Sequence, residues 1–159
     1  MATGTWTSAR TVMCMSLLIA GSVRAEDPAI EGTFTGNGTP AKLAFITASK
    51  GEPFSGKPTI QIIMTEKDHS KAKNPSIKAG FGEFGSALII TVHPDGKIIG
   101  CEVAHQAHAR KPFSSIGKIS TKDFKIADGV ITSKLSTEGE QEFFKQKWEV
   151  KLAFKVKAP

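Results

Sequence analysis

Alternation of apolar and polar residues dominates this chain, and it is clearest in KWEVKLAFKVK, residues 147–157. Successive side chains of a strand point to opposite faces, so this period of two predicts a half-buried antiparallel strand. The apolar face consists of Trp148, Val150, Leu152, Phe154 and Val156. Lysines fill most of the other face, which either solubilises the strand or meets an anionic surface.

Turn signals join similar segments into hairpins. Asp95-Gly96 separates SALIITVH from KIIGCEVAH, and Asp128-Gly129 separates KDFKIA from VITSKL. Both dipeptides favour two-residue turns, whose positive φ angles match the twist of antiparallel strands. Asn37-Gly38 predicts a third hairpin, and PTIQIIMT, residues 58–65, predicts one more strand.

The hairpin at Asp95-Gly96 has one register that gathers its apolar residues on a single face. If those two residues form the turn, the pairs are Val92 with Ile99, Ile90 with Cys101, and Leu88 with Val103. The second hairpin pairs Ile126 with Ile131 by the same rule. Cys101 is then expected among aliphatic side chains.

One segment favours a helix, between Asn74 and Gly85. Pro75 suits the first helical position, and three apolar residues share one helical face, namely Ile77, Phe81 and Phe84. The glycine-rich part, GFGEFG, follows this helix and precedes a strand, which is the wrong order for a dinucleotide-binding loop. Roughly eight short strands with this one helix predict an all-β fold, an antiparallel β-sandwich or flattened β-barrel.

The N-terminal segment predicts export. Arg10 precedes the apolar run 11–20, and Val23 and Ala25 suit a signal-peptidase site, so residues 1–25 are interpreted as a cleaved signal peptide. Residues 26–159 then form a single β-rich domain, secreted or periplasmic, without a transmembrane segment. Losing Arg10 and Arg24 lowers the formal net charge from +6 to +4.

A metal site is conceivable in GCEVAHQAHARKPF, residues 100–113, because copper and zinc bind thiolate and imidazole groups. The predicted register buries Cys101, which disfavours its thiolate. His105 lies four residues further on, about 13 Å along an extended strand. Copper or zinc binding by His105 and His108, with an unidentified third ligand, remains an alternative to a half-buried and an exposed structural histidine.

Binding surfaces are expected on loops, and two segments qualify, 49–58 and 106–115. The second contains Arg110, Lys111 and Phe113, a basic and apolar combination that suits an unknown protein or an anionic surface. The sequence disfavours nucleic acid as a partner, because the chain has no tyrosine and Trp148 faces the expected core.

The sequence contains no catalytic constellation that we recognise. No G-x-S-x-G, H-E-x-x-H or P-loop motif occurs, and the carboxylates are scattered rather than paired. The leading hypothesis is therefore a non-enzymatic binding or structural module with no cofactor. The alternative is transition-metal binding through His105 and His108.

Overall fold

A computed structural model describes Met1 and residues 29–159 of the chain. The predicted signal peptide, residues 1–25, lies outside the described residues except for Met1. The described chain forms eleven strands and one helix: β1 (Ala29–Gly36), β2 (Thr39–Ala41), β3 (Phe45–Phe54), β4 (Lys57–Thr65), α1 (Pro75–Gly80), β5 (Ala87–Val92), β6 (Ile98–Ala104), β7 (Phe113–Ser114), β8 (Ser120–Ala127), β9 (Val130–Ser136), β10 (Gln141–Phe143) and β11 (Gln146–Lys157). No described helix has the length and apolar character needed to cross a membrane.

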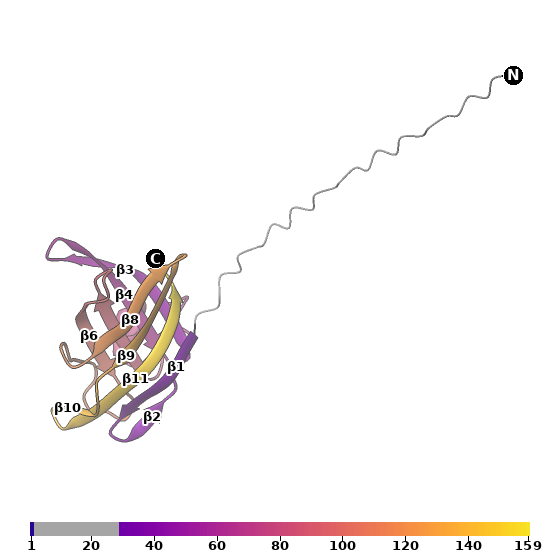
Figure 1. The fold of residues 1–159 in the computed structure, drawn as a ribbon. Coiled ribbons are helices and arrows are strands. Elements are labelled where there is room, and N and C mark those ends of the chain that lie inside the picture. Colours follow the sequence, from indigo (N-terminus) through magenta and orange to yellow (C-terminus); the bar gives the residue numbers. More distant parts are fainter. Residues whose placement is uncertain (2–28) are drawn as a thin grey trace.

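The strands form two antiparallel sheets that pack face to face as a β-sandwich (Figure 1). One sheet has the order β2-β1-β11-β9-β8, with β10 paired to β11, and the other has the order β3-β4-β5-β6-β7. The all-β prediction is confirmed, and of its two variants the structure is the sandwich. Three of the strands have only two or three residues, which explains why about eight were expected.

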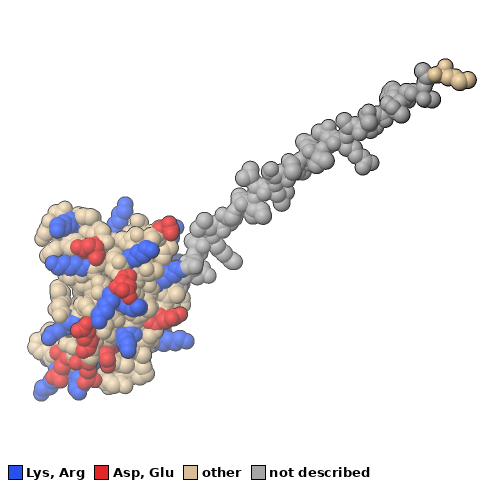
Figure 2. Space-filling model, viewed as in Figure 1, with Lys and Arg blue, Asp and Glu red and all other residues tan. Residues whose placement is uncertain are grey.

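The period-two prediction for the last strand is confirmed by β11. All five residues of its apolar face are buried, and they pack in the main core with strands of the other sheet. The opposite face looks outward, where lysines alternate with acidic side chains over the sheet seen in Figure 2. Two exposed ion pairs lie there, Lys122 with Glu138 and Lys134 with Asp123.

Four hairpins of the described chain have two-residue turns, and both turn residues have positive φ in each. The predicted turns Asn37-Gly38 and Asp128-Gly129 are two of them, and Ile126 pairs with Ile131 as expected. The other two are Ser55-Gly56 and Phe144-Lys145. The expected loop 49–58 is wrong, because strands β3 and β4 cover it except for the turn at Ser55-Gly56. No turn was predicted at Phe144-Lys145. These positive φ values are those of type I′ turns, which match the right-handed twist of the strands.

The turn at Asp95-Gly96 is longer than predicted. The Gly96 N–H donates to the His93 carbonyl and the His93 N–H donates to the Lys97 carbonyl, so the turn also includes Pro94. Val92 therefore pairs with Ile98 and not with Ile99, and a bulge follows. Because the bulge adds one residue, the predicted register returns further along, where Ile90 faces Cys101 and Leu88 faces Val103.

The predicted helix is shorter than expected. It covers Pro75–Gly80, with Pro75 in the first turn, and Asn74 precedes it without a side-chain capping bond. Gly82 and Gly85 both have positive φ, which ends the helical conformation before Phe84. Ile77 and Phe81 are exposed, and Phe84 packs against a small apolar cluster on the outer face of the second sheet.

One glycine of β1 determines how the two sheets close at the β10 end. Gly36 lies opposite Trp148 in the β1–β11 pair, and a Cβ atom at Gly36 would overlap the ring of His105. His105 follows directly after β6 of the other sheet. The missing side chain is therefore what lets the imidazole occupy the space between the sheets.

We predict that Gly36→Ala lowers the free energy of unfolding by about 2 kcal/mol, because the methyl group forces His105 out of place. Chemical denaturation measures this loss. The control is Gly100→Ala, whose added Cβ meets the Thr91 side chain at 3.2 Å, a much milder contact. Equal stability of the two variants would contradict this account.

Candidate functional site

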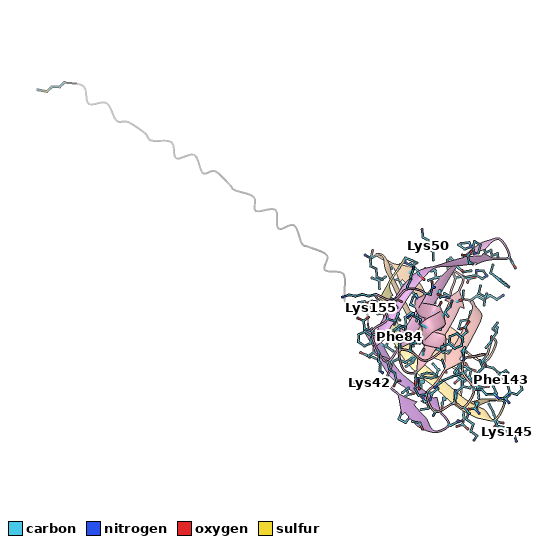
Figure 3. The ribbon with its side chains drawn as sticks, turned by 180° about the vertical axis from the view of Figure 1, so that it is seen from behind. Lys42, Lys50, Phe84, Phe143, Lys145 and Lys155 are labelled. Atoms are coloured by element: carbon cyan, nitrogen blue, oxygen red, sulfur yellow. The ribbon has the colours of Figure 1, made fainter. Side chains whose placement is uncertain are left out.

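Three segments that are distant in sequence meet at the β10 end of the sandwich. They are the turn after β1, the loop 105–112 between β6 and β7, and the turn between β10 and β11. Figure 3 shows Phe143 and Lys145 at this end and Lys50 at the opposite end of the molecule. The loop overlaps segment 106–115, in which a binding surface was predicted.

Asn37 ties the three segments together. Its Nδ2 donates to the Ala107 carbonyl (3.0 Å) and to Gln146 Oε1 (3.3 Å). Its Oδ1 accepts from the Lys147 N–H (2.8 Å), and its own N–H donates to the Lys147 carbonyl (2.8 Å). Gln146 Oε1 also accepts from the Ala109 N–H (3.0 Å). The loop is thus held to β11 by bonds with little freedom to shift.

His105 and His108 both lie inside the protein, with 1% and 3% of their surfaces exposed. The sequence had indicated a half-buried and an exposed histidine, and this is wrong for both. Their ring centroids are 5.3 Å apart, and the His105 ring meets Phe34 edge-on at 5.0 Å. His108 was expected to point outward from a loop, but its Nε2 donates inward to the Lys147 carbonyl (2.9 Å).

The hydrogen bonds assign the neutral tautomer of each ring. His105 Nδ1 accepts from the Ala107 N–H (3.1 Å), so its proton is on Nε2 and that atom has no lone pair for a metal. His108 donates through Nε2, so its lone pair is on Nδ1, as in many metal-bound histidines. One ring is thus arranged as a ligand and the other is not. The described residues contain no group of three or more His, Cys, Asp or Glu suited to a metal ion.

Burial lowers the pKa of both histidines. Desolvation is the main cause for His105, helped by the nearby His108, and brings its pKa to about 4. Desolvation also lowers the pKa of His108, while its bond to the Lys147 carbonyl partly opposes the shift. Both rings are therefore neutral at pH 7.

Three buried nitrogen atoms at this end have no hydrogen-bond partner among the described residues. They are His105 Nε2, His108 Nδ1 and Trp148 Nε1. Each imidazole therefore makes one hydrogen bond to the described residues, through Nδ1 of His105 and through Nε2 of His108.

Phe113 connects the core to the surface. It is buried, so it is not the apolar tip that the sequence suggested, and it contacts the rings of Trp148 (6.2 Å) and His108 (5.4 Å). On its outer side it stacks on Phe143 at 5.1 Å, and Phe143 meets Phe144 edge-on at 4.5 Å. The apolar part of the surface is therefore Phe143 and Phe144, which the sequence analysis missed.

Basic side chains flank this pair. The Arg110 guanidinium lies over the Phe144 ring, 5.9 Å from its centroid, and Lys111 Nζ donates to Gln106 Oε1 (2.9 Å). Arg110, Lys111 and Lys145 make none of the ion pairs found among the described residues. We call Arg110, Lys111, Phe143, Phe144 and Lys145 the aromatic–basic surface.

The turn that presents Phe144 is the exception among the four two-residue turns. The other three have glycine in the second position after Asn37, Ser55 or Asp128. Here Phe144 has φ 48° and Lys145 has φ 61°, a conformation that costs a residue with a side chain about 1–2 kcal/mol. Phe144 is nevertheless 68% exposed, so burial of its ring does not repay the strain.

Cys101 is placed as predicted. It is 1% exposed in the main core, and burial, together with the charge of Glu102, raises the pKa of its thiol to about 12. A thiol with this pKa is neither a nucleophile nor a metal ligand at neutral pH.

A third buried histidine, His69, escaped the sequence analysis. Thr65 Oγ1 donates to the Lys67 carbonyl (2.7 Å), so it accepts from His69 Nδ1 (2.6 Å), and His69 Nε2 accepts from Thr47 Oγ1 (2.8 Å). Both ring nitrogens are satisfied. His69 therefore holds the segment after β4 to the outer face of its sheet. The sequence gives no signal for this role, because a single histidine in a polar segment is usually exposed.

We predict that stability falls as the pH falls from 6.5 to about 4. The unfolded chain takes up protons on both histidines near pH 6.5, whereas the folded chain resists because their pKa values are lowered. Each pKa unit is worth about 1.4 kcal/mol, so His105 accounts for up to about 3 kcal/mol. Urea denaturation between pH 7 and pH 5 measures the slope, and His105→Asn, which keeps an acceptor for Ala107, should flatten it. An unchanged slope in the variant would contradict the assignment.

The tautomers also predict the outcome of a metal titration. Wild type and His105→Ala should bind copper(II) and zinc equally weakly, because His105 Nε2 carries a proton. Isothermal titration calorimetry measures this. Micromolar affinity that is lost in His105→Ala would instead support the two-histidine metal site.

The sequence matches no protein-family model, and neither the curated proteins nor the solved structures give a match. No relative therefore supplies a function for this chain. The geometry of the β10 end carries the functional argument by itself.

Proposed function

We propose that this chain is an extracytoplasmic binding module, and that it binds its partner through the aromatic–basic surface. The observation that carries the proposal is Phe144, a large apolar side chain held in solvent by a strained turn. Backbone strain that no packing of the same residue offsets is common in functional segments. The export signal predicted for residues 1–25 supports the compartment.

Interface chemistry supports this assignment. Aromatic and arginine side chains dominate the energetics of protein interfaces, and here Arg110 and Phe144 are already in contact. The bonds of Asn37 and Gln146 hold the loop to β11, so little ordering entropy is lost on binding. The surface is a fixed feature, with Phe143 resting on the buried Phe113.

Metal binding is the second hypothesis and has narrower support. Only the free lone pair of His108 Nδ1 favours it, and the proton on His105 Nε2 opposes it. A structural role accounts for the two rings better than metal binding does, because His108 holds the loop to the Lys147 carbonyl.

We predict that Phe144→Asn combined with Lys145→Gly removes binding and raises stability by about 1 kcal/mol. Asn-Gly is the preferred pair for a type I′ turn, so the fold gains while the surface loses its aromatic ring. The measurement is retention of a bound component from the extracytoplasmic fraction of the source, with thermal unfolding in parallel.

The matched control is Phe54→Ser, which removes an exposed phenylalanine next to another two-residue turn, on β3. This variant should retain binding. Equal retention by all three proteins would overturn the proposal. Catalytic turnover of a substrate, abolished by one polar substitution elsewhere, would assign the chain to a different class.

A further inference from the structure

The aromatic–basic surface has an acidic edge. On β10, Glu142 faces Lys147 across the strand pair, and Glu140 forms an ion pair with the same lysine at 2.8 Å. Figure 2 shows acidic and basic side chains side by side at this end of the molecule. The surface therefore has two carboxylates beside its cations.

This pattern discriminates between classes of partner. A uniformly charged polyanion, such as a nucleic acid, a sulfated polysaccharide or an anionic bilayer, would gain contacts with Arg110 and Lys145. It would also meet Glu140 and Glu142, and Lys147 balances only one of these two negative charges, so like charges brought together in the interface would cost affinity. A polypeptide can place a carboxylate opposite the cations and leave the acidic edge free.

The centre of the surface adds a second requirement. Phe144 is 68% exposed and Phe143 36% exposed, and the two rings are in contact. A partner that covers them must supply an apolar side chain, because burying the rings against charged groups alone would desolvate those charges without compensation. Anchors of this kind lie at the centre of protein interfaces and are surrounded by polar contacts.

We propose that the partner is an acidic polypeptide segment, with one apolar side chain that covers Phe144 and flanking carboxylates that meet Arg110 and Lys145. This inference rests on the proposed function and specifies the partner of the same surface. Arg110 is suited to the role, since its planar guanidinium can receive a carboxylate in two parallel hydrogen bonds while it stays on the Phe144 ring.

The experiment is a selection from random peptides displayed on phage, with the full-length purified protein as bait. The expected peptides combine an aromatic or aliphatic residue with at least two Asp or Glu residues. Synthetic copies should bind at least tenfold more weakly to Phe144→Asn/Lys145→Gly and to Arg110→Gln. Binding to Phe54→Ser should be unchanged, and raising the salt concentration should weaken binding to the wild type.

In parallel, the wild-type protein is tested for binding to heparin, to a single-stranded DNA oligonucleotide and to phosphatidylglycerol vesicles in 0.15 M salt. We expect the protein to bind none of these polyanions. If a polyanion binds in a Phe144-dependent way and no peptide does, the acidic-peptide inference fails while the binding function stands. If no probe depends on Phe144, both fail. Sedimentation should show a monomer, and a dimer abolished by Phe144→Asn/Lys145→Gly would make a second copy the partner and overturn the inference.

Discussion

The close approach of His105 to Gly36 is the constraint on which the β10 end depends. Gly36 lies in β1 of one sheet and His105 directly follows β6 of the other, and the imidazole fits between the sheets only because β1 has no side chain at this position. Once the ring is there, its Nδ1 fixes the Ala107 N–H, and the loop runs next to β11. Asn37, immediately after Gly36, then completes the attachment to Lys147 and Gln146.

A continuous series of aromatic contacts connects the buried core to the exposed ring of Phe144. Trp148 and Phe113 belong to the main core, Phe143 stacks on Phe113, and Phe144 meets Phe143 edge-on. The exposed ring is thus supported from beneath by packed groups. Preorganisation of this kind reduces the entropy lost on association, so a small surface can bind usefully.

The sequence predicted those parts of the molecule that follow local rules. Alternation identified β11, and Asn37-Gly38 and Asp128-Gly129 identified two hairpins, because few other residues adopt paired positive φ values. At Asp95-Gly96 the turn also takes up Pro94, and a bulge cancels the error before Cys101 is reached, so a correct register came from an incorrect turn. The candidate surface was only partly predictable. The sequence indicated Arg110 and Lys111 as a basic pair in a loop, but Phe144-Lys145 contains no glycine or asparagine and therefore gives no turn signal.

Among the four two-residue turns of the described chain, only the one at the β10 end places two residues with side chains at positive φ. The Phe144-Lys145 turn therefore strains two such residues, whereas each of the other three turns has glycine in the second position. The hairpin between β3 and β4 shows that the same chain can place glycine second in such a turn, after Ser55 at φ 51°, so a second residue with a side chain at positive φ is not required by the architecture. Proteins retain such local strain where activity requires it, and the stability of the rest of the core compensates for it. The additional strained residue in the turn that presents Phe144 is therefore an argument for function that does not depend on which partner binds.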